Sequence, residues 1–364
     1  MSSISTRKQK HIAVTLKENV ESEIQTGFED THLIHRSIPE IDLSEIDIST
    51  YVFGKKINAP LIISSITGGT KEAEKINKIL ALTAEKYNIG IGVGSQRIAI
   101  EHPETKKTFS VVRDNAPNSF IIANLGCPQL SLGWGVKEAR EAVEMISADA
   151  LAIHMNPLQE AIQINGDTNF RGTLQKIDNL AASLSTPIIM KETGCGISYY
   201  DAKKLEDVGV AGFDVSGLGG TSWAAVEHHI AKSEGKDEQE HLGKVFWNWG
   251  IPTVCSLIEV RNATNRVVLA SGGIRTGLEM AKSIALGADG VGIAKPFLEK
   301  AVQGKEELEK HIQKIINELK LVMFLVSARN IDDLKHVPIV VTGWTAEYIR
   351  RRGFNLESLA QRGK

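Results

Sequence analysis

Two stretches of this sequence place residue types that do chemistry close together. His154–Glu160 (HMNPLQE) holds an imidazole, two side-chain amides and one carboxylate within seven residues. Ser271–Thr276 (SGGIRT) joins a glycine pair, which lets the backbone approach a ligand, to Arg275 and the expected start of a helix. We interpret this stretch as a phosphate cradle of backbone amides and Arg275. A tight turn that simply needs glycine is the alternative, but the second strand end at Ala294 and Lys295 favours phosphate.

The elements that position these stretches follow a repeating pattern. Eight short apolar runs end in small or polar residues, at Pro60–Gly69, Ile89–Ser95, Ser119–Gly126, Ala150–Pro157, Pro187–Gly194, Gly212–Gly220, Val267–Ile274 and Gly290–Phe297. Such continuous apolarity is typical of strands buried on both faces. Helical spacing of apolar residues recurs between them, at Lys71–Tyr87, Lys137–Ile146, Tyr200–Val208, Ala224–Ser233 and Leu278–Leu286.

Eight strands alternating with helices predict the α/β class and a (β/α)8 TIM barrel. A doubly wound open sheet fits less well because no GxGxxG opens the first helix. We expect an N-terminal arm and barrel cap over residues 1–58, the barrel over 59–298, and a C-terminal helix and tail over 299–364. Phe28–Ile57 is expected to cap the barrel bottom. Lys305–Ala328 is expected to form a charged helix that packs on the barrel or on a neighbouring subunit, and Asn165–Asp167 and Gly235–Leu242 look like loop insertions.

The composition excludes several classes of protein. Lys and Arg number 42 against 44 Asp and Glu, so a net charge of −2 gives no field that would favour nucleic acid or an anionic membrane. Cys127, Cys195 and Cys255 lie more than fifty residues apart and indicate neither a disulfide framework nor a metal cage. The N-terminus lacks an apolar signal, and Leu321–Val326 is too short to span a bilayer. We therefore expect a cytoplasmic protein.

In such barrels chemistry collects on the loops after the strands. The last two expected strands resemble those of FMN-binding barrels, which include hydroxy-acid oxidases and inosine monophosphate dehydrogenases. Hydroxy-acid oxidases carry a proton-abstracting His after the sixth strand, where this sequence has Leu218, and leucine cannot accept a proton. Inosine monophosphate dehydrogenases carry a nucleophilic cysteine on the same loop, and none of the three cysteines falls there.

The chain resembles type 2 isopentenyl diphosphate isomerase over nearly its whole length. HMNPLQE followed by NGD at Asn165–Asp167 is the most discriminating motif. The other motifs are Arg7-Lys8-x-x-His11, Ile66–Gly69 (ITGG, where the family more often has MTGG), Ser95–Arg97, Asn124, Lys191–Gly194, Ser216–Thr221, Gly272–Arg275 and Ala294-Lys295.

The resemblance implies interconversion of isopentenyl diphosphate and dimethylallyl diphosphate by a 1,3-proton shift. Reduced FMN would act as acid and base, Mg²⁺ would hold the diphosphate, and NAD(P)H would be the reductant. It also implies a homotetramer or homo-octamer. Two other hypotheses stay open: an FMN-dependent dehydrogenase or oxidase of a phosphorylated small molecule, and a non-catalytic flavin or phosphate carrier.

The resemblance also implies roles for individual residues. Gln159 would position substrate or relay a proton, Lys191 would tune the flavin, and Glu160 would bind the metal. Substrate contacts would come from Arg7, Lys8, His11, Ser95, Gln96, Arg97, His154, Asn156 and Gln159. FMN contacts would come from Ile66, Thr67, Gly68, Ser95, Asn124, Lys191, Ser216, Thr221, Gly273, Ile274, Arg275, Ala294 and Lys295. Without the resemblance, the basic cluster at residues 7–11 would be interpreted as a solvated terminus.

Overall fold

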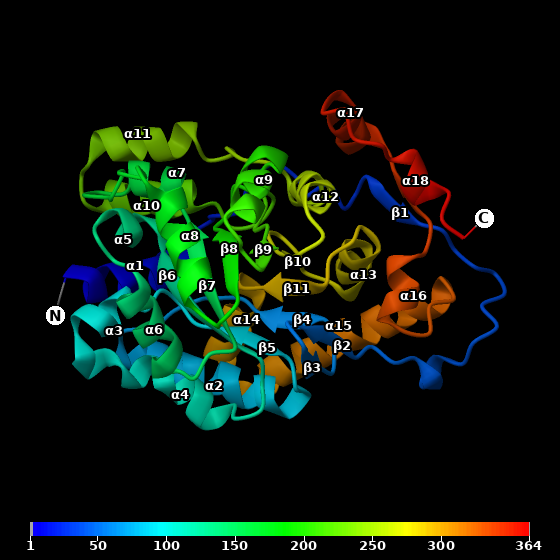
Figure 1. The fold of residues 1–364 in the computed structure, drawn as a ribbon, viewed down its shortest axis with the longest axis horizontal. Coiled ribbons are helices and arrows are strands. Elements are labelled where there is room, and N and C mark those ends of the chain that lie inside the picture. The colour runs from blue at the N-terminus through cyan, green and yellow to red at the C-terminus, as the bar shows by residue number, and fades with distance from the viewer. Residues whose placement is uncertain (1–2, 364) are drawn as a thin grey trace.

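The computed structural model describes residues 3–363 and is built around a closed barrel of eight parallel strands (Figure 1). In order around the barrel these are β4 (Leu61–Ile63), β5 (Gly90–Gly92), β6 (Ile121–Gly126), β7 (Ala150–Met155), β8 (Ile188–Glu192), β9 (Gly212–Asp214), β10 (Val267–Ala270) and β11 (Gly290–Ile293). Closure is made by β11 against β4, with Val291 opposite Leu61. The predicted barrel is confirmed. Its strands are shorter than the apolar runs. In seven of the eight the last residues of the run leave the ladder and form the rim, whereas β6 and its run both end at Gly126.

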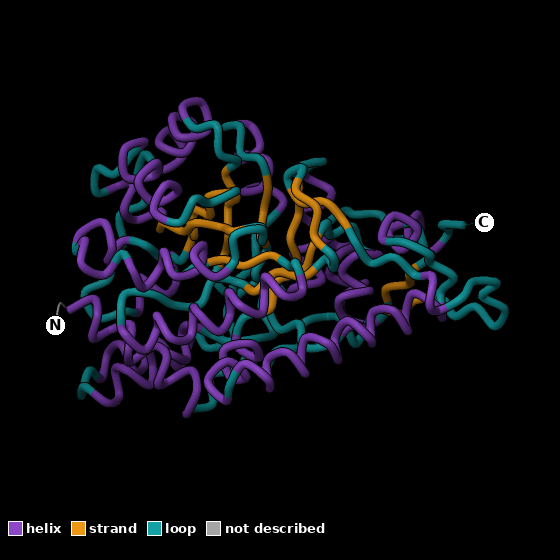
Figure 2. The backbone as a smooth tube through the Cα atoms, turned by 90° about the horizontal axis from the view of Figure 1, so that it is seen from below, coloured by secondary structure: helices purple, strands orange, loops and turns teal. Residues whose placement is uncertain are grey.

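Helices surround these strands, as Figure 2 shows from a second direction. The outer ring consists of α2 (Lys71–Tyr87), α4 (Lys107–Asn115), α6 (Val136–Met145), α8 (Thr173–Ser183), α9 (Tyr199–Asp207), α12 (Thr253–Ala263), α13 (Gly277–Ala285) and α14 (Lys295–Gln303). Further helices follow the strand ends: α3 (Arg97–Glu101), α5 (Cys127–Ser131), α7 (Pro157–Ile162), α10 (Trp223–Ser233) and α11 (Asp237–Val245). No helix in this described part of the chain is long and apolar enough to cross a membrane.

The prediction of a loop is wrong for one of the two expected insertions. Residues 165–167 do lie in a loop between α7 and α8, but most of Gly235–Leu242 belongs to α11. The sequence of α11 suits a helix because Asp237 and Glu238 occupy its first turn and Lys244 its last, which complements the helix dipole.

A short hairpin closes the barrel at the amino ends of its strands. Strands β2 (Thr50–Val52) and β3 (Lys55–Ile57) bury Val52 and Ile57 against residues from the starts of several barrel strands. The Phe53 ring stacks on Phe120 with centroids 6.2 Å apart and lies beside Gly212, the first residue of β9. Thus only the last part of Phe28–Ile57 covers the barrel bottom. Strand β1 (Thr31–Leu33) pairs instead with β12 (Ile339–Val341) near the other end of the chain.

The C-terminal extension packs on the outside of the barrel. Helix α15 (Lys305–Leu325) lies against α13, α14 and α2, and it buries Leu308, Ile312, Ile315, Leu319 and Met323. The shorter helices α16 (Ile331–Lys335), α17 (Gly343–Arg351) and α18 (Glu357–Ala360) complete the tail. In Figure 1 they lie at the opposite end of the molecule from the N-terminus.

Glu259 of α12 connects the barrel to α17. Its carboxylate is fully buried and accepts hydrogen bonds from Arg352 Nε (2.9 Å), Tyr348 Oη (3.1 Å) and the Tyr199 amide (2.8 Å). Because three donors from two segments converge on one buried acceptor, removing its charge leaves the Arg352 guanidinium without a counter-ion.

We expect Glu259→Gln to lower the free energy of unfolding by about 2 kcal/mol. Urea unfolding monitored by circular dichroism measures this change. Glu347→Gln is the matched control, since Glu347 pairs with Arg351 on the exposed face of α17 and should cost less than about 0.5 kcal/mol. Equal losses of unfolding free energy in the two variants would contradict a stabilising role for the buried Glu259 carboxylate.

Candidate active site at the carboxyl ends of the barrel strands

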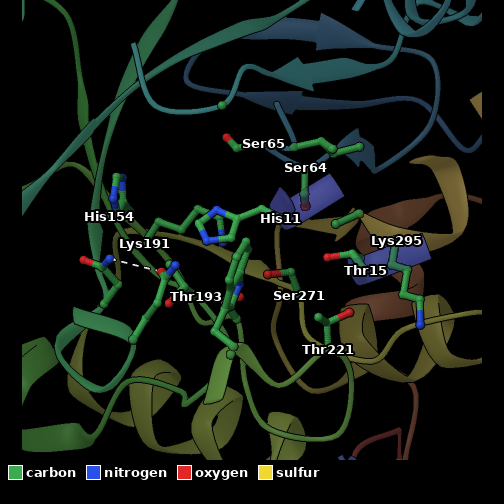
Figure 3. Close-up of a pocket in the computed structure, with 18 of the residues that line it drawn as sticks. His11, Thr15, Ser64, Ser65, His154, Lys191, Thr193, Thr221, Ser271 and Lys295 are labelled. Carbon is green, nitrogen blue, oxygen red and sulfur yellow. Dashed lines mark hydrogen bonds between the residues drawn. The ribbon is translucent and has the colours of Figure 1, made fainter. Parts of the chain in front are cut away.

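All eight strand ends contribute side chains to one cavity in the mouth of the barrel. One residue from each in turn is Ser64, Ser95, Asn124, His154, Lys191, Ser216, Ser271 and Lys295. Figure 3 shows His154 and Lys191 on one side, Thr221 and Lys295 on the other, and His11 between them. Of the 22 site residues named from the sequence, 20 line this cavity, and Gly68 and Gln96 do not. The structure therefore brings together residues from position 7 to position 295.

Gln96 and Gly68 are placed by packing, away from the cavity wall. Gln96 is fully buried; its Nε2 donates to Ala142 O (2.8 Å) and its Oε1 accepts from the Asn124 amide (2.9 Å). A side chain at Gly68 would meet the Phe109 ring, since an added Cβ would lie 2.0 Å from it. Both residues therefore fix the rim loops, and the expected substrate contact of Gln96 has no support in the geometry.

Helix α1 (Ser3–Lys17) forms the roof of the cavity. Residues at positions 7, 8, 11, 12 and 15 line the cavity, and this spacing of three and four places them on one helical face. The helix is held by an apolar cluster in which Val14 and Val20 pack against α10, and by an ion pair of 2.5 Å between Lys10 and Glu234. The basic cluster therefore covers the mouth.

Burial changes the protonation of two basic side chains at the cavity, Lys8 in the roof and His154 on the rim. Lys8 Nζ donates to Ser95 O at 2.7 Å, and burial, together with neighbouring Arg7, lowers the pKa of Lys8 to about 7. Burial also lowers the pKa of His154 to about 4, with Lys191 and Lys8 adding to the effect. Lys8 is thus poised to gain a proton when an anion binds, whereas His154 is neutral in the protein alone.

The hydrogen bonds of His154 indicate which nitrogen carries the proton. Its Nδ1 lies 2.8 Å from Asn124 Oδ1, while Asn124 Nδ2 donates to Val93 O at 3.1 Å. Because the amide oxygen faces the ring, Nδ1 is the donor, and Nε2 has no proton at neutral pH. Holding a diphosphate oxygen through Nε2 would therefore require proton uptake.

The HMNPLQE segment ends β7, starts α7 and forms a connected set of polar groups. Asn156 Nδ2 donates to Gln159 Oε1 (3.1 Å) and Glu160 Oε1 (3.0 Å). Glu160 Oε2 accepts from the Asp167 amide at 2.8 Å. This contact explains the NGD motif, since a side chain at Gly166 would place its Cβ 1.9 Å from Glu160 O. Asn156 Oδ1 is buried without a partner, so an oxygen ligand beside Glu160 stays available.

Sequence reasoning missed Glu227 on α10. Glu227 is 3% exposed, and its Oε1 accepts from Gln159 Nε2 (3.1 Å) and lies 3.0 Å from His11 Nε2. It thereby connects the roof to the residue expected to act on substrate. A signal was present, because Glu227 interrupts the buried apolar face made by Ala224, Val226 and Ile230.

A second missed carboxylate, Asp214, lies opposite Lys191 in the register of β8 and β9. Lys191 Nζ donates to Glu192 O at 2.7 Å and lies 3.6 Å from Asp214 Oδ2. Asp214 is buried and also accepts from Ser271 Oγ. The charge of Lys191 is thus balanced by a carboxylate on the neighbouring strand. Glu192 does not line the cavity and accepts the amides of the following loop.

The predicted phosphate cradle is wrong in one respect. The amides of Arg275 and Thr276 donate to Glu279 Oε2 at 2.7 and 3.0 Å, and the Gly277 amide donates to Glu318 Oε2 at 2.7 Å. Thr276 and Glu279 form a capping box, so carboxylates already satisfy the start of α13. Phosphate contacts must therefore come from elsewhere on these loops, where the Arg275 and Lys295 side chains line the cavity.

Gly272 and Gly273 are required by the packing of two loops. They have φ of +102° and +73°, a region that favours glycine. An added Cβ at Gly272 would lie 2.2 Å from Gly217 O, and one at Gly273 would lie 2.4 Å from Gly219 O. The glycines therefore let the loops after β9 and β10 cross closely, which brings both loops to the cavity.

The fold and this cavity define an enzyme of the FMN-binding barrel class. The model of the FMN-dependent dehydrogenase family matches residues 129–340. A flavocytochrome b2 variant with sulfite bound aligns with a TM-score of 0.67 and 18% identity, covering 95% of this chain and 88% of that one. Lactate oxidase of Pediococcus acidilactici gives a TM-score of 0.66 and 15% identity over 94% of each chain. At such identities these structures show a shared fold alone.

Full-length relatives narrow the class to one family. Isopentenyl-diphosphate delta-isomerase of Methanosarcina barkeri is 46% identical over 100% of this chain and 99% of its own length. The protein of the same name from Pyrococcus furiosus is 49% identical over 98% of this chain and 92% of its own. That of Thermococcus kodakarensis is 48% identical over 95% and 94%. The chain belongs to the isopentenyl-diphosphate delta-isomerase family, and the resemblance predicted from its motifs is confirmed.

Binding of inorganic diphosphate should take up a proton through Lys8. The lowered pKa leaves Lys8 largely neutral above about pH 7, and a bound anion restores the ammonium. Diphosphate affinity should therefore fall as pH rises above about 7, by up to about tenfold per unit. Calorimetry in two buffers of different ionisation enthalpy measures the proton uptake. The Lys8→Met variant should lose the proton uptake that comes from Lys8. The control variant Lys10→Met should retain this uptake, since Lys10 pairs with Glu234. The same uptake in wild type and Lys8→Met would refute this role.

Proposed function

We propose that this protein interconverts isopentenyl diphosphate and dimethylallyl diphosphate by a 1,3-proton shift, using reduced FMN and Mg²⁺. The observation that carries the proposal is the hydrogen-bonded chain Gln159–Glu227–His11, in which Gln159 and His11 line the roofed cavity and the buried Glu227 carboxylate joins them. It connects the amide of the HMNPLQE segment to the imidazole of the roof through one carboxylate, and Lys191 lines the same cavity. Family membership at 46–49% identity over nearly the whole chain supports the same activity.

The described residues fit an FMN molecule in the mouth of the barrel. Ser64 Oγ lines the cavity and is buried without a protein partner, so it can bind a polar ring atom. Lys295 lies at the opposite side of the cavity from His154 (Figure 3). Arg275 also lines the cavity and contacts the same carboxylate as Lys295, so both cations suit the phosphate. When bound, reduced FMN supplies the nitrogen acid and base that the hydrocarbon chemistry needs. The ammonium of Lys191 would favour the anionic reduced form.

The donor set also fits Mg²⁺. Glu160 supplies one carboxylate, and the unpartnered Asn156 Oδ1 supplies a second hard oxygen. No cluster of three or more His, Cys, Asp or Glu side chains able to hold a metal occurs among residues 3–363. We therefore propose that metal affinity depends on the diphosphate, whose oxygens would complete the coordination sphere.

The difficult step is protonation of an unactivated alkene, which develops positive charge at the tertiary carbon. Arg7 and Lys8 would hold the diphosphate from the roof, and Arg97 would do so from the rim. Gln159, held by Asn156 and Glu227, would position the hydrocarbon or relay a proton. Helix α1 would exclude water from the developing cation. NAD(P)H as reductant, a cytoplasmic location and a homotetramer or homo-octamer stay predictions from the sequence.

Oxidation of a phosphorylated substrate is less well supported. Leu218 is 3% exposed and does not line the cavity, so no base occupies the place of the oxidase His. No cysteine is among the lining residues that the structure describes. Burial also raises the pKa of Cys127 and Cys255 to about 12, which keeps both thiols protonated.

Isomerisation in heavy water with reduced FMN and Mg²⁺ tests the proposal. Deuterium should enter the methyl group formed from the terminal methylene carbon, because that carbon is protonated by a group that exchanges with solvent. Mass spectrometry and NMR of the dimethylallyl product measure it, and oxidised FMN is the matched control. Product without deuterium, in protein that holds both FMN and Mg²⁺, would contradict an exchanging acid.

Deleting residues 1–10 tests the roof. The shortened chain loses Arg7 and Lys8, and the KM for isopentenyl diphosphate should rise on the order of 100-fold because two charge-assisted contacts are lost. Bound flavin, measured by its absorbance, should be retained. The double variant Arg7→Gln, Lys8→Gln in the full chain separates charge from coverage. Unchanged kinetics in the shortened chain would exclude a role for α1 in substrate binding.

A further inference from the structure

Glu21 bridges the two cations that suit the cofactor phosphate. Its Oε2 lies 2.7 Å from Arg275 Nη2, on the loop after β10, and its Oε1 lies 2.6 Å from Lys295 Nζ, at the end of β11. One carboxylate thus connects two strand ends that are adjacent in the barrel. Neither the motifs nor the relatives' names single out this residue.

The backbone around Glu21 is fixed by the loop after β9. The Ser22 amide donates to Gly220 O (2.8 Å), and the Ser222 amide donates to Val20 O (2.7 Å). Trp247 Nε1 donates to Glu21 O itself at 2.9 Å. The side chain is 36% exposed, so it can change rotamer while its backbone stays in place. Its neighbours in sequence lead directly into the roof helix α1, which ends at Lys17.

The charges at this point do not balance once a phosphate is added. Arg275 and Lys295 contribute two positive charges, and Glu21 contributes one negative charge. Glu299 adds a second carboxylate, 3.9 Å from Lys295 Nζ. A phosphate monoester brings a charge of about −1.5 to −2 at pH 7. It would also require N–H donors of the same guanidinium and ammonium groups. A phosphate and the Glu21 carboxylate therefore compete for one set of donors.

We propose that Glu21 is an internal competitor for the FMN phosphate, and that it releases Arg275 and Lys295 when the phosphate binds. The proposal rests on the proposed function in taking FMN as the cofactor. Through the segment 18–22, this exchange connects the phosphate end of the flavin to α1. Glu21 thereby sets how strongly the phosphate contributes to cofactor affinity, and it leaves the contribution of the ring system unchanged.

Glu21→Gln tests the proposal, because it keeps the shape of the side chain and removes its charge. Fluorescence titration of flavin-stripped protein measures the Kd of FMN and of riboflavin, which lacks the phosphate. Glu21→Gln should bind FMN about tenfold more tightly and riboflavin with unchanged affinity. Glu23→Gln is the matched control. Glu23 lies two residues after Glu21, and its carboxylate accepts a hydrogen bond from Asn248 and contacts neither Arg275 nor Lys295. An unchanged FMN Kd, or equal changes for FMN and riboflavin, would overturn the proposal.

A second measurement, the thermal unfolding temperature with and without FMN, tests the same exchange of Glu21 for phosphate. Without flavin, Glu21→Gln should unfold at a lower temperature than wild type because two cations lose their counter-ion. With saturating FMN the difference should disappear. Should Glu21→Gln fail to fold, Glu21→Asp, whose shorter carboxylate cannot bridge both cations, should show the same tighter FMN binding. A stability difference that persists with FMN would show a purely structural role. Wild type that binds neither flavin would contradict the proposed function itself.

Discussion

Eight parallel strands close in sequential order, so each strand delivers its carboxyl end to the same rim of the barrel. Backbone groups within the strands are satisfied by the ladder, and the side chains in the first part of each strand are apolar and mostly buried. The polar side chains of the site enter over the last residues of the ladders and on the loops that follow them. His154 and Lys191 illustrate this, because the register pairs them across β7 and β8 at the edge of the cavity. Closure therefore concentrates residues that are far apart in sequence.

Carboxylates below and beside the cavity determine which cations are free to bind an anion. Asp214 lies 3.6 Å from Lys191, Asp167 pairs with Arg97 at 2.9 Å, and Glu21 bridges Arg275 and Lys295. Lys8 differs, because its ammonium donates to a carbonyl and burial lowers its pKa to about 7. The roof thus supplies a cation whose charge appears in response to the ligand, while the charges of the rim are already partly balanced.

Much of the fold was predictable because periodicity is a local property. The helix expected at Lys71–Tyr87 has those bounds in the structure, and the helix expected at Leu278–Leu286 is displaced by one residue as α13. Contacts across the barrel could not be predicted in this way. Gln96 turns to α6 although Ser95 and Arg97 on either side face the cavity, and no local pattern distinguishes the three. Glu21, Asp214 and Glu227 acquire their roles only from strand register and helix packing.

A 1,3-proton shift in this cavity changes the position of an alkene with no net redox change. The most direct measurement counts product molecules per flavin, after a single anaerobic photoreduction and with no further reductant. We expect many molecules of dimethylallyl diphosphate per flavin while the absorbance of the reduced flavin stays constant. Product formed once per flavin, in step with reoxidation of that flavin, would contradict it.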